Sequence, residues 1–142
     1  MADVSGKGGP ASLSMAICRS ALRAEARGSV SPAEVLQKVN RQLYPDIKED
    51  MFISMAYLIL DHKSSSAILS RGGHDAPLLY RAATGEVTNL KPPWMALGID
   101  SGNVFERVAA DVSVPLEPGG CTVLYAAGIT DAPQATGDNV GP

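Results

Sequence analysis

The chain has 142 residues, of which 45% are hydrophobic, 19% charged and 5% aromatic, and its formal net charge is −3 at pH 7. This length and composition are typical of one soluble globular domain with a sizeable core. No cluster of Lys and Arg is present, which argues against a nucleic-acid or anionic-lipid partner. The longest apolar run, 51–60, is too short to span a bilayer, so we expect no membrane segment.

The first predicted element is a helix over residues 10–27. Pro10 suits a first helical turn, and apolar side chains recur at spacings of three and four residues between Leu13 and Leu22. Gly28 follows and is predicted to act as the C-cap.

A second helix begins at the tetrapeptide SPAE, residues 31–34, which has the form of a capping box. Ser31 is the cap, Pro32 takes the first helical position and Glu34 reaches back towards the helix start. Pro45 ends this helix, and its inner stripe consists of Val35, Leu36, Val39 and Leu43. The short link between the two helices predicts an antiparallel helix hairpin.

After Asp50 the apolar pattern changes to the period of a strand. Residues 51–60 are apolar at both alternating sets of positions, which predicts a strand covered on both faces. The later predicted strands are 67–71, a hairpin of 77–81 and 86–90 with Gly85 in its turn, a half-solvated strand over 104–114, and a last strand over 121–127. Helices followed by antiparallel strands indicate the α+β class, with the helices packed on a sheet.

The two cysteines, Cys18 and Cys121, each lie in an apolar segment. We expect them to be buried free thiols in preference to a disulfide or a metal-binding pair. Free thiols fit a reducing compartment, and the first nine residues lack the apolar stretch of a signal peptide. We therefore expect a cytoplasmic location.

The segment Asp3–Gly9, DVSGKGG, invites comparison with a phosphate-binding P-loop but does not match it. That motif needs a Gly five residues before the Gly-Lys pair and Ser or Thr after the Lys, whereas this chain has Met1 and Gly8 there. The remaining interpretation is a glycine-rich helix start whose N–H groups are free to take an anion. Its possible anion or substrate contacts are Ser5, Gly6, Lys7 and Gly8.

Two histidines and several aspartates are further candidates for chemistry. His62 lies in a polar loop and is expected to be exposed, whereas His74 follows Gly72 and Gly73, which permit a close backbone approach. A structural hydrogen bond and a catalytic role both stay open for His74. Carboxylates converging from strand ends would suit a hard cation, and those at the ends of apolar segments are Asp3, Asp50, Asp61 and Asp131.

Five segments, in order, carry a family resemblance: ADVSGKGGPASLSMA, then SPAEVLQKVNRQLYPDIKEDMFISMAYLILD, GGHDAPLLYR, ALGID and LEPGGCTVLYAAGITDA. The series resembles the PPM (type 2C) serine/threonine phosphatases, in the bacterial branch similar to stage II sporulation protein E and the stress-sigma regulators. The resemblance implies an α-β-β-α sandwich with a two-metal Mn²⁺ or Mg²⁺ site at one edge, where a metal-bound hydroxide attacks phosphoserine. It also implies phosphorylated anti-sigma-factor antagonists, small STAS-domain proteins, as substrates.

By this resemblance, Asp3 is a metal ligand and the backbone carbonyl of Val4 is another. The family carries Thr-Asp-Gly where this chain has Ala126, Ala127 and Gly128, so Ala127 replaces a metal aspartate and the site is degenerate there. The family's Gly-Gly-Asp strand upstream and its last Asp-bearing strand have no counterpart here. We therefore expect one PPM-like domain over 1–142 that is incomplete at both ends.

One carboxylate does not hold a pair of divalent cations, because such cations lose their water only for several oxygen ligands. We therefore expect weak or absent metal binding and a domain that is inactive alone, a pseudophosphatase or truncated form that still binds its partner. One alternative is an active phosphatase completed by another subunit, or by Asp131 and Asp138 folding inward; another is a non-enzymatic partner-binding or oligomerising domain. Because missing strands leave sheet edges unpaired, we also expect a homo-oligomer with residues 121–127 near the contact.

Overall fold

The computed structural model describes residues 1–48 and 50–134. Within these ranges the helices are α1 (Gly8–Glu25), α2 (Pro32–Leu43), α3 (Phe105–Val108) and α4 (Ala127–Thr130). The strands are β1 (Ala2–Val4), β2 (Ile53–Asp61), β3 (Ser66–Gly72), β4 (Leu78–Arg81), β5 (Glu86–Asn89), β6 (Val112–Pro115) and β7 (Cys121–Val123). They form two antiparallel sheets, ordered β1-β2-β3-β6 and β5-β4-β7.

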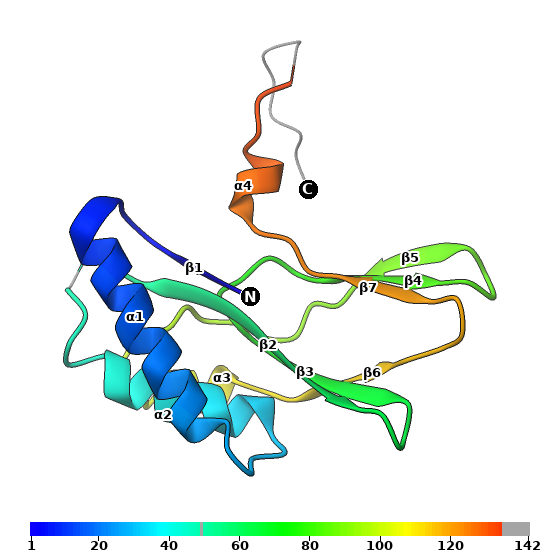
Figure 1. The fold of residues 1–142 in the computed structure, drawn as a ribbon, viewed down its shortest axis with the longest axis horizontal. Helices are drawn as coiled ribbons and strands as arrows, with labels where there is room; N and C mark the ends of the chain where they lie inside the picture. Colours follow the sequence, from blue (N-terminus) through cyan, green and yellow to red (C-terminus); the bar gives the residue numbers. More distant parts are fainter. Residues whose placement is uncertain (49, 135–142) are drawn as a thin grey trace.

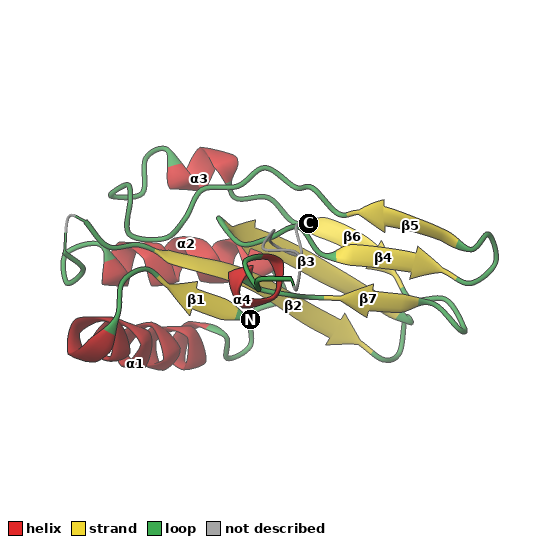
Figure 2. Cartoon of the chain, turned by 90° about the horizontal axis from the view of Figure 1, so that it is seen from above, coloured by secondary structure: helices red, strands yellow, loops and turns green. Residues whose placement is uncertain are grey.

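The helices and the two sheets form three layers. Figure 1 shows α1 and α2 side by side against the first sheet, with the second sheet on its other side. Figure 2 shows the two sheets from above, with β5, β4 and β7 over β2 and β3. The α+β class predicted from the sequence is confirmed. Among the described residues no helix is long and apolar enough to cross a membrane.

Two apolar cores hold the layers together. One lies between the helices and the first sheet and includes Cys18, Leu36, Ile53, Leu97 and Phe105. The other lies between the sheets and consists of Ala56, Ala67, Leu69, Leu79 and Val114. Strand β2 supplies both cores because its side chains alternate between the two faces. Its two-sided burial was predicted correctly for the first half only, since Leu60 is 64% exposed near the hairpin tip.

The start of α2 confirms Ser31 as the predicted cap, but among the described residues the Glu34 side chain makes no hydrogen bond back to the Ser31 N–H, so only half of the capping box is present. The structure adds a second cap that the sequence did not indicate. Ser31 Oγ accepts a hydrogen bond of 3.1 Å from the Glu34 N–H, and Pro32 is the first helical residue. A second N–H of the first turn, that of Ala33, donates to Asp111 Oδ1 over 2.7 Å. Because Asp111 is 78 residues away in the chain, this cap depends on the tertiary fold.

The long strand predicted over 104–114 is wrong in its first half. Residues 105–108 form α3, and only Val112–Pro115 form β6. The cause is Asp100, whose Oδ2 accepts hydrogen bonds from the N–H groups of Gly102, Val104 and Phe105 and so gathers the chain into a helical turn. These hydrogen bonds lower the pKa of Asp100.

Other sequence predictions are corrected at their ends. Helix α1 ends at Glu25 with Ala26 as its C-cap, not at residue 27 with Gly28 as the cap. The last strand ends at Val123, not at residue 127, and Ala127 begins α4. Cys121 is an exposed free thiol, not a buried one, since it lies on the outer edge strand β7, whereas Cys18 is buried as predicted.

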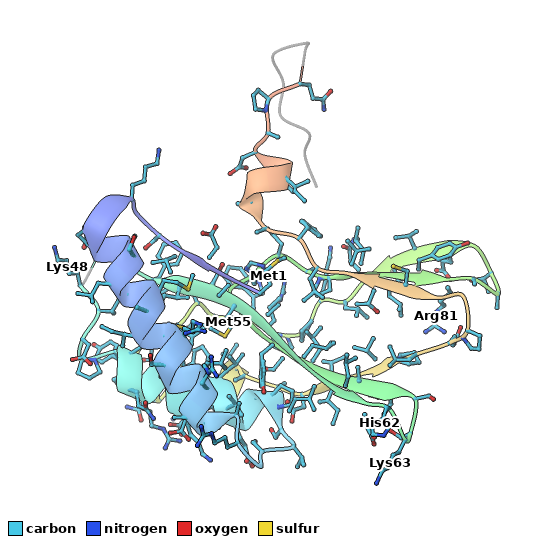
Figure 3. The ribbon with its side chains drawn as sticks, in the orientation of Figure 1. Met1, Lys48, Met55, His62, Lys63 and Arg81 are labelled. Carbon is cyan, nitrogen blue, oxygen red and sulfur yellow. The ribbon has the colours of Figure 1, made fainter. Side chains whose placement is uncertain are left out.

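The hairpin and the exposed histidine agree with the sequence predictions. Strands β4 and β5 pair with each other, and Gly85 has a φ of +69° in the turn between them. His62 is exposed, and Figure 3 shows it with Lys63 at the tip of the β2–β3 hairpin, far from Met1.

Candidate functional site

Asp3 is positioned by the pairing of β1 with β2, in which it lies opposite Ser54. Its neighbours Ala2 and Val4 pack against the core under the helices, so Asp3 faces the opposite side of the sheet. The loop that follows is hydrogen-bonded to Phe52, the residue that precedes β2. The Ser5 N–H donates to the Phe52 carbonyl over 3.0 Å, and the Phe52 N–H donates to Ser5 Oγ over 2.7 Å.

A cavity of about 250 Å³ lies beside Asp3 and joins four parts of the chain. It is lined by Asp3, Val4, Ser5, Phe52, Ser54, Gly73, His74, Asp75 and Ala127. The metal positions expected from the family resemblance, Asp3 and Val4, therefore share one cavity with the degenerate position Ala127. Of the four possible anion contacts, Ser5 lines this cavity, and Gly6, Lys7 and Gly8 do not.

The other expected positions lie outside this cavity. Gly128 and Asp131 do not line it, and Asp131 is exposed at the end of α4. Asp61 instead binds its own turn, accepting hydrogen bonds from Lys63 and Ser64, and the bond from Ser64 is the main reason that its pKa is lowered. Asp50 is exposed and does not line the cavity. Asp138 lies outside the described residues.

His74 is the most deeply buried polar group of the cavity, with 3% of its surface exposed. Its Nδ1 lies 2.8 Å from Ser54 Oγ, whereas its Nε2 has no hydrogen-bond partner among the described residues. Burial lowers the pKa of His74, and the charges of Asp75 and Asp3 oppose that change in part. Burial thus favours the neutral imidazole, which is hydrogen-bonded to Ser54.

Gly73 and Arg71 hold the backbone around His74 in place. Gly73 has a φ of +74°, and a Cβ on it would lie 2.6 Å from the Cα of Ala96, so the close approach expected of this glycine is present. Arg71 is buried and donates hydrogen bonds to the carbonyls of His74, over 3.1 Å, and Pro92, over 2.9 Å. Its guanidinium also lies 5.9 Å from the ring centroid of Trp94.

Sequence reasoning missed both Arg71 and Asp75. Arg71 shapes the turn, and burial lowers the pKa of its guanidinium. Asp75 contributes a second carboxylate to the cavity. A signal for Asp75 was present, since it follows His74 directly in the segment GGHDAP.

The charge of the cavity suits a cation better than an anion. Asp3 and Asp75 are its charged lining residues, and no Lys or Arg is among them. Even so, the described residues contain no group of three or more His, Cys, Asp or Glu arranged to hold a metal ion. Because Ala127 offers only a methyl group, the described residues that line this cavity do not fit a two-metal centre.

Comparison with known proteins gives consistent matches over nearly the whole chain. The family model of stage II sporulation protein E (SpoIIE) matches residues 1–141. Phosphoserine phosphatase RsbU from Bacillus subtilis (strain 168) is 26% identical over 137 residues, which are 96% of this chain and 40% of that protein.

Solved structures share the fold. The PP2C domain of SiaA from Pseudomonas aeruginosa matches with a TM-score of 0.76 and 24% identity, over 99% of this chain and 54% of that one. The RsbU and RsbW domains of a Mycobacterium tuberculosis protein match with a TM-score of 0.74 and 24% identity, over 93% of this chain and 35% of that one. The chain thus spans about half, or less, of the length of these relatives.

Proposed function

Because the chain belongs to the stage II sporulation protein E (SpoIIE) family of PPM phosphatase domains, we propose that it has lost metal-dependent hydrolysis and retains the recognition of a protein partner. The observation that supports this proposal is the cavity that Asp3 and Ala127 both line, because the family resemblance predicts a metal aspartate at the position of Ala127. Mn²⁺ and Mg²⁺ need several oxygen ligands before they give up water. Hydrolysis that depends on a metal-bound hydroxide is therefore not expected from this chain.

The proposed partner class is a phosphorylated anti-sigma-factor antagonist with a STAS domain. The support is the similarity to RsbU, a phosphoserine phosphatase. The negative charge of the cavity affects which form of this partner binds. Without bound metal, Asp3 and Asp75 repel a phosphate group, since like charges at close range raise the energy of the complex. The partner is therefore held by its protein surface, and its unphosphorylated form binds at least as tightly as its phosphorylated form.

The test compares the parent chain with two variants, Ala127→Asp and Ala126→Asp. Ala126 is the matched control because it is adjacent in the chain and does not line the cavity. Calorimetric titration with Mn²⁺ is expected to give no saturable binding to the parent, measurable binding to Ala127→Asp and none to Ala126→Asp. Phosphate release from a phosphoserine peptide by the parent is expected to stay at background.

Mn²⁺-dependent turnover by the parent that Asp3→Ala abolishes would overturn the proposal. If the specific rate also rose with chain concentration, a second subunit would be completing the active site. Binding of phosphorylated and unphosphorylated STAS-domain proteins, measured on the same parent chain, tests recognition separately. A clear preference for the phosphorylated form would contradict the charge argument.

A further inference from the structure

Two groups of the candidate cavity lie close enough to act together, the hydroxyl of Ser54 and the imidazole of His74. Ser54 Oγ is 2.8 Å from His74 Nδ1, a distance typical of a hydrogen bond. Both residues line the cavity of about 250 Å³ beside Asp3. A serine within hydrogen-bond reach of a basic nitrogen is the arrangement that activates a hydroxyl as a nucleophile. Ser54 and His74 therefore have the geometry of a nucleophile with its base.

The surroundings of His74 keep its ring in place. His74 is 3% exposed, whereas Ser54 on β2 is half-buried. Arg71 donates a hydrogen bond to the His74 carbonyl, and Gly73 packs closely against Ala96. In other nucleophile–base pairs a third side chain orients the base. Here burial of the ring and the hydrogen-bonded turn have that role.

The direction of the hydrogen bond decides whether Ser54 is activated. A neutral imidazole carries its proton either on Nδ1, which then donates to Ser54 Oγ, or on Nε2, which leaves Nδ1 free to accept from Ser54. Burial lowers the pKa of His74, and an interaction with the backbone of Tyr125 opposes that change in part. A backbone carbonyl only accepts hydrogen bonds, so it favours a ring proton on the nitrogen that Ser54 does not contact. Nδ1 then accepts the Ser54 proton.

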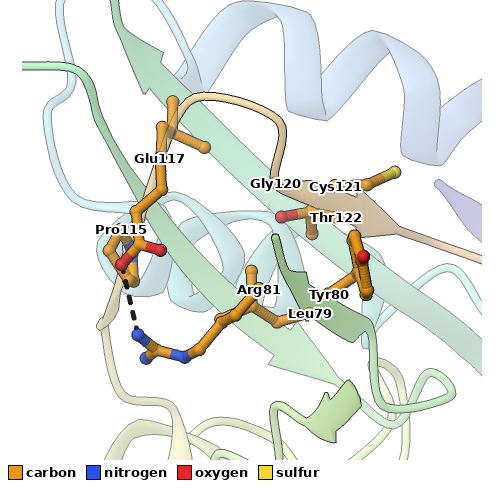
Figure 4. A pocket seen from close by; sticks show the side chains of 9 residues that line it. Leu79, Tyr80, Arg81, Pro115, Glu117, Gly120, Cys121 and Thr122 are labelled. Carbon is orange, nitrogen blue, oxygen red and sulfur yellow. Dashed lines mark hydrogen bonds and ion pairs between the residues drawn. The ribbon is translucent and has the colours of Figure 1, made fainter. Parts of the chain in front are cut away.

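The nucleophilic cysteines of the chain lack such a base. Cys121 is exposed, and Figure 4 shows it at a small cavity of about 70 Å³ in which Arg81 pairs with Glu117. No histidine is among the residues that line that cavity. Cys18 is buried in the core under the helices. Within the described part of the chain, Ser54 is thus the nucleophilic side chain that is hydrogen-bonded to a histidine.

The other residues of the cavity limit which substrates can reach Ser54. Asp3 and Asp75 are negatively charged and no Lys or Arg lines the cavity, so an anionic substrate is repelled. Phe52 and Ala127 add apolar surface, and an aromatic ring beside carboxylates suits a positively charged group. The volume of about 250 Å³ is that of a small-molecule pocket. The cavity therefore favours small substrates that are neutral or positively charged.

We propose that Ser54, with His74 as its general base, is the nucleophile for acyl transfer from a small neutral or cationic carboxylic ester. The bond from Ser54 Oγ to the carbonyl carbon forms as the Oγ proton passes to His74 Nδ1. The bond from that carbon to the alcohol oxygen then breaks, and the alcohol leaves with the proton from His74. Water attacks the acyl-serine by the same steps, which gives a carboxylic acid and the free hydroxyl. The activity is separate from the recognition of a protein partner, because it uses this chain alone.

A fluorophosphonate probe tests the nucleophile in the parent chain, because it forms an Oγ–phosphorus bond with activated serines and releases fluoride. Mapping of the adduct by mass spectrometry is expected to place it on Ser54, a result that does not depend on the folding of any variant. His74→Gln is expected to slow the labelling roughly 10²–10⁴-fold, the usual contribution of a general base. Ser20→Ala, which removes an exposed hydroxyl on α1, is expected to react at the parental rate. Labelling only at other serines, or an equal rate in His74→Gln, would overturn the proposal.

Three esters test the substrate class in the same chain. The parent is expected to hydrolyse para-nitrophenyl acetate, which is neutral, and acetylthiocholine, which is positively charged. The anionic hemisuccinate ester of para-nitrophenol is expected to react at least about tenfold more slowly, because Asp3 and Asp75 repel it. Ser54→Ala is expected to abolish all three activities. Hydrolysis that persists in Ser54→Ala, or a preference for the anionic ester, would contradict the assignment. Neither result bears on phosphate release, which tests the loss of metal-dependent hydrolysis.

Discussion

Replacing Gly73 with alanine is expected to destabilise the protein by about 2–5 kcal/mol, and two features of the structure give this magnitude. The φ of Gly73 is +74°, and the left-handed region costs a residue with a Cβ roughly 1–2 kcal/mol. The new Cβ would also lie 2.6 Å from both Cα and Cβ of Ala96, closer than unbonded carbons approach. Relieving such overpacking costs roughly 1–3 kcal/mol.

A loss of this size is a large part of the stability of an ordinary domain, which is about 5–15 kcal/mol. Urea denaturation followed by circular dichroism measures it. With a urea dependence of roughly 1–3 kcal/mol per molar, the midpoint is expected to fall by on the order of 1–2 M.

Gly85→Ala is the matched control for the close approach at Gly73. Gly85 has a similar φ of +69°, but a Cβ there would meet no atom within 4 Å. Only the backbone strain is added, so a loss of about 1 kcal/mol is expected. Equal losses in the two variants would refute the contact between Gly73 and Ala96, and with it the placement of His74 in the cavity.

Three further predictions concern Ser31 and Cys18, both in the helix layer. Ser31→Ala is expected to lower the free energy of unfolding by about 1 kcal/mol, because the Glu34 N–H loses its acceptor, and an unchanged urea midpoint would contradict this cap. Burial raises the pKa of Cys18 to about 11, so a thiol reagent at pH 8 is expected to label only Cys121 in the native chain. In urea, both cysteines are expected to react. Rapid labelling of two thiols in the native chain would disprove the burial of Cys18. The Cys18 thiol holds its proton more tightly in the folded state than in the unfolded state. Its contribution to the free energy of unfolding is therefore fully present below the ordinary pKa of 9.0 and is lost as the pH rises towards about 11. Cys18→Ala is expected to reduce this decline in stability.

The sequence by itself determined those elements that depend on residues close together in the chain. The cap at Ser31, the two-sided pattern that starts β2 and the glycine turn between β4 and β5 each depend on neighbouring residues, and each is present in the structure. That Ala127 replaces a metal aspartate stays a prediction from the sequence, made from the family resemblance of the segment around it. Such features can be predicted because periodicity and short-range hydrogen bonds act within a few residues.

Only the tertiary structure decided the features that join distant residues. The cap from Asp111 to α2, the cavity that Asp75 and Asp3 both line, and the edge position of β7 all depend on which strands pair and in which register. The sequence did not indicate that Cys121 is exposed, because an apolar strand looks the same at the edge of a sheet as in its middle. Burial there is set by the neighbours that the fold supplies, and long-range packing selects them.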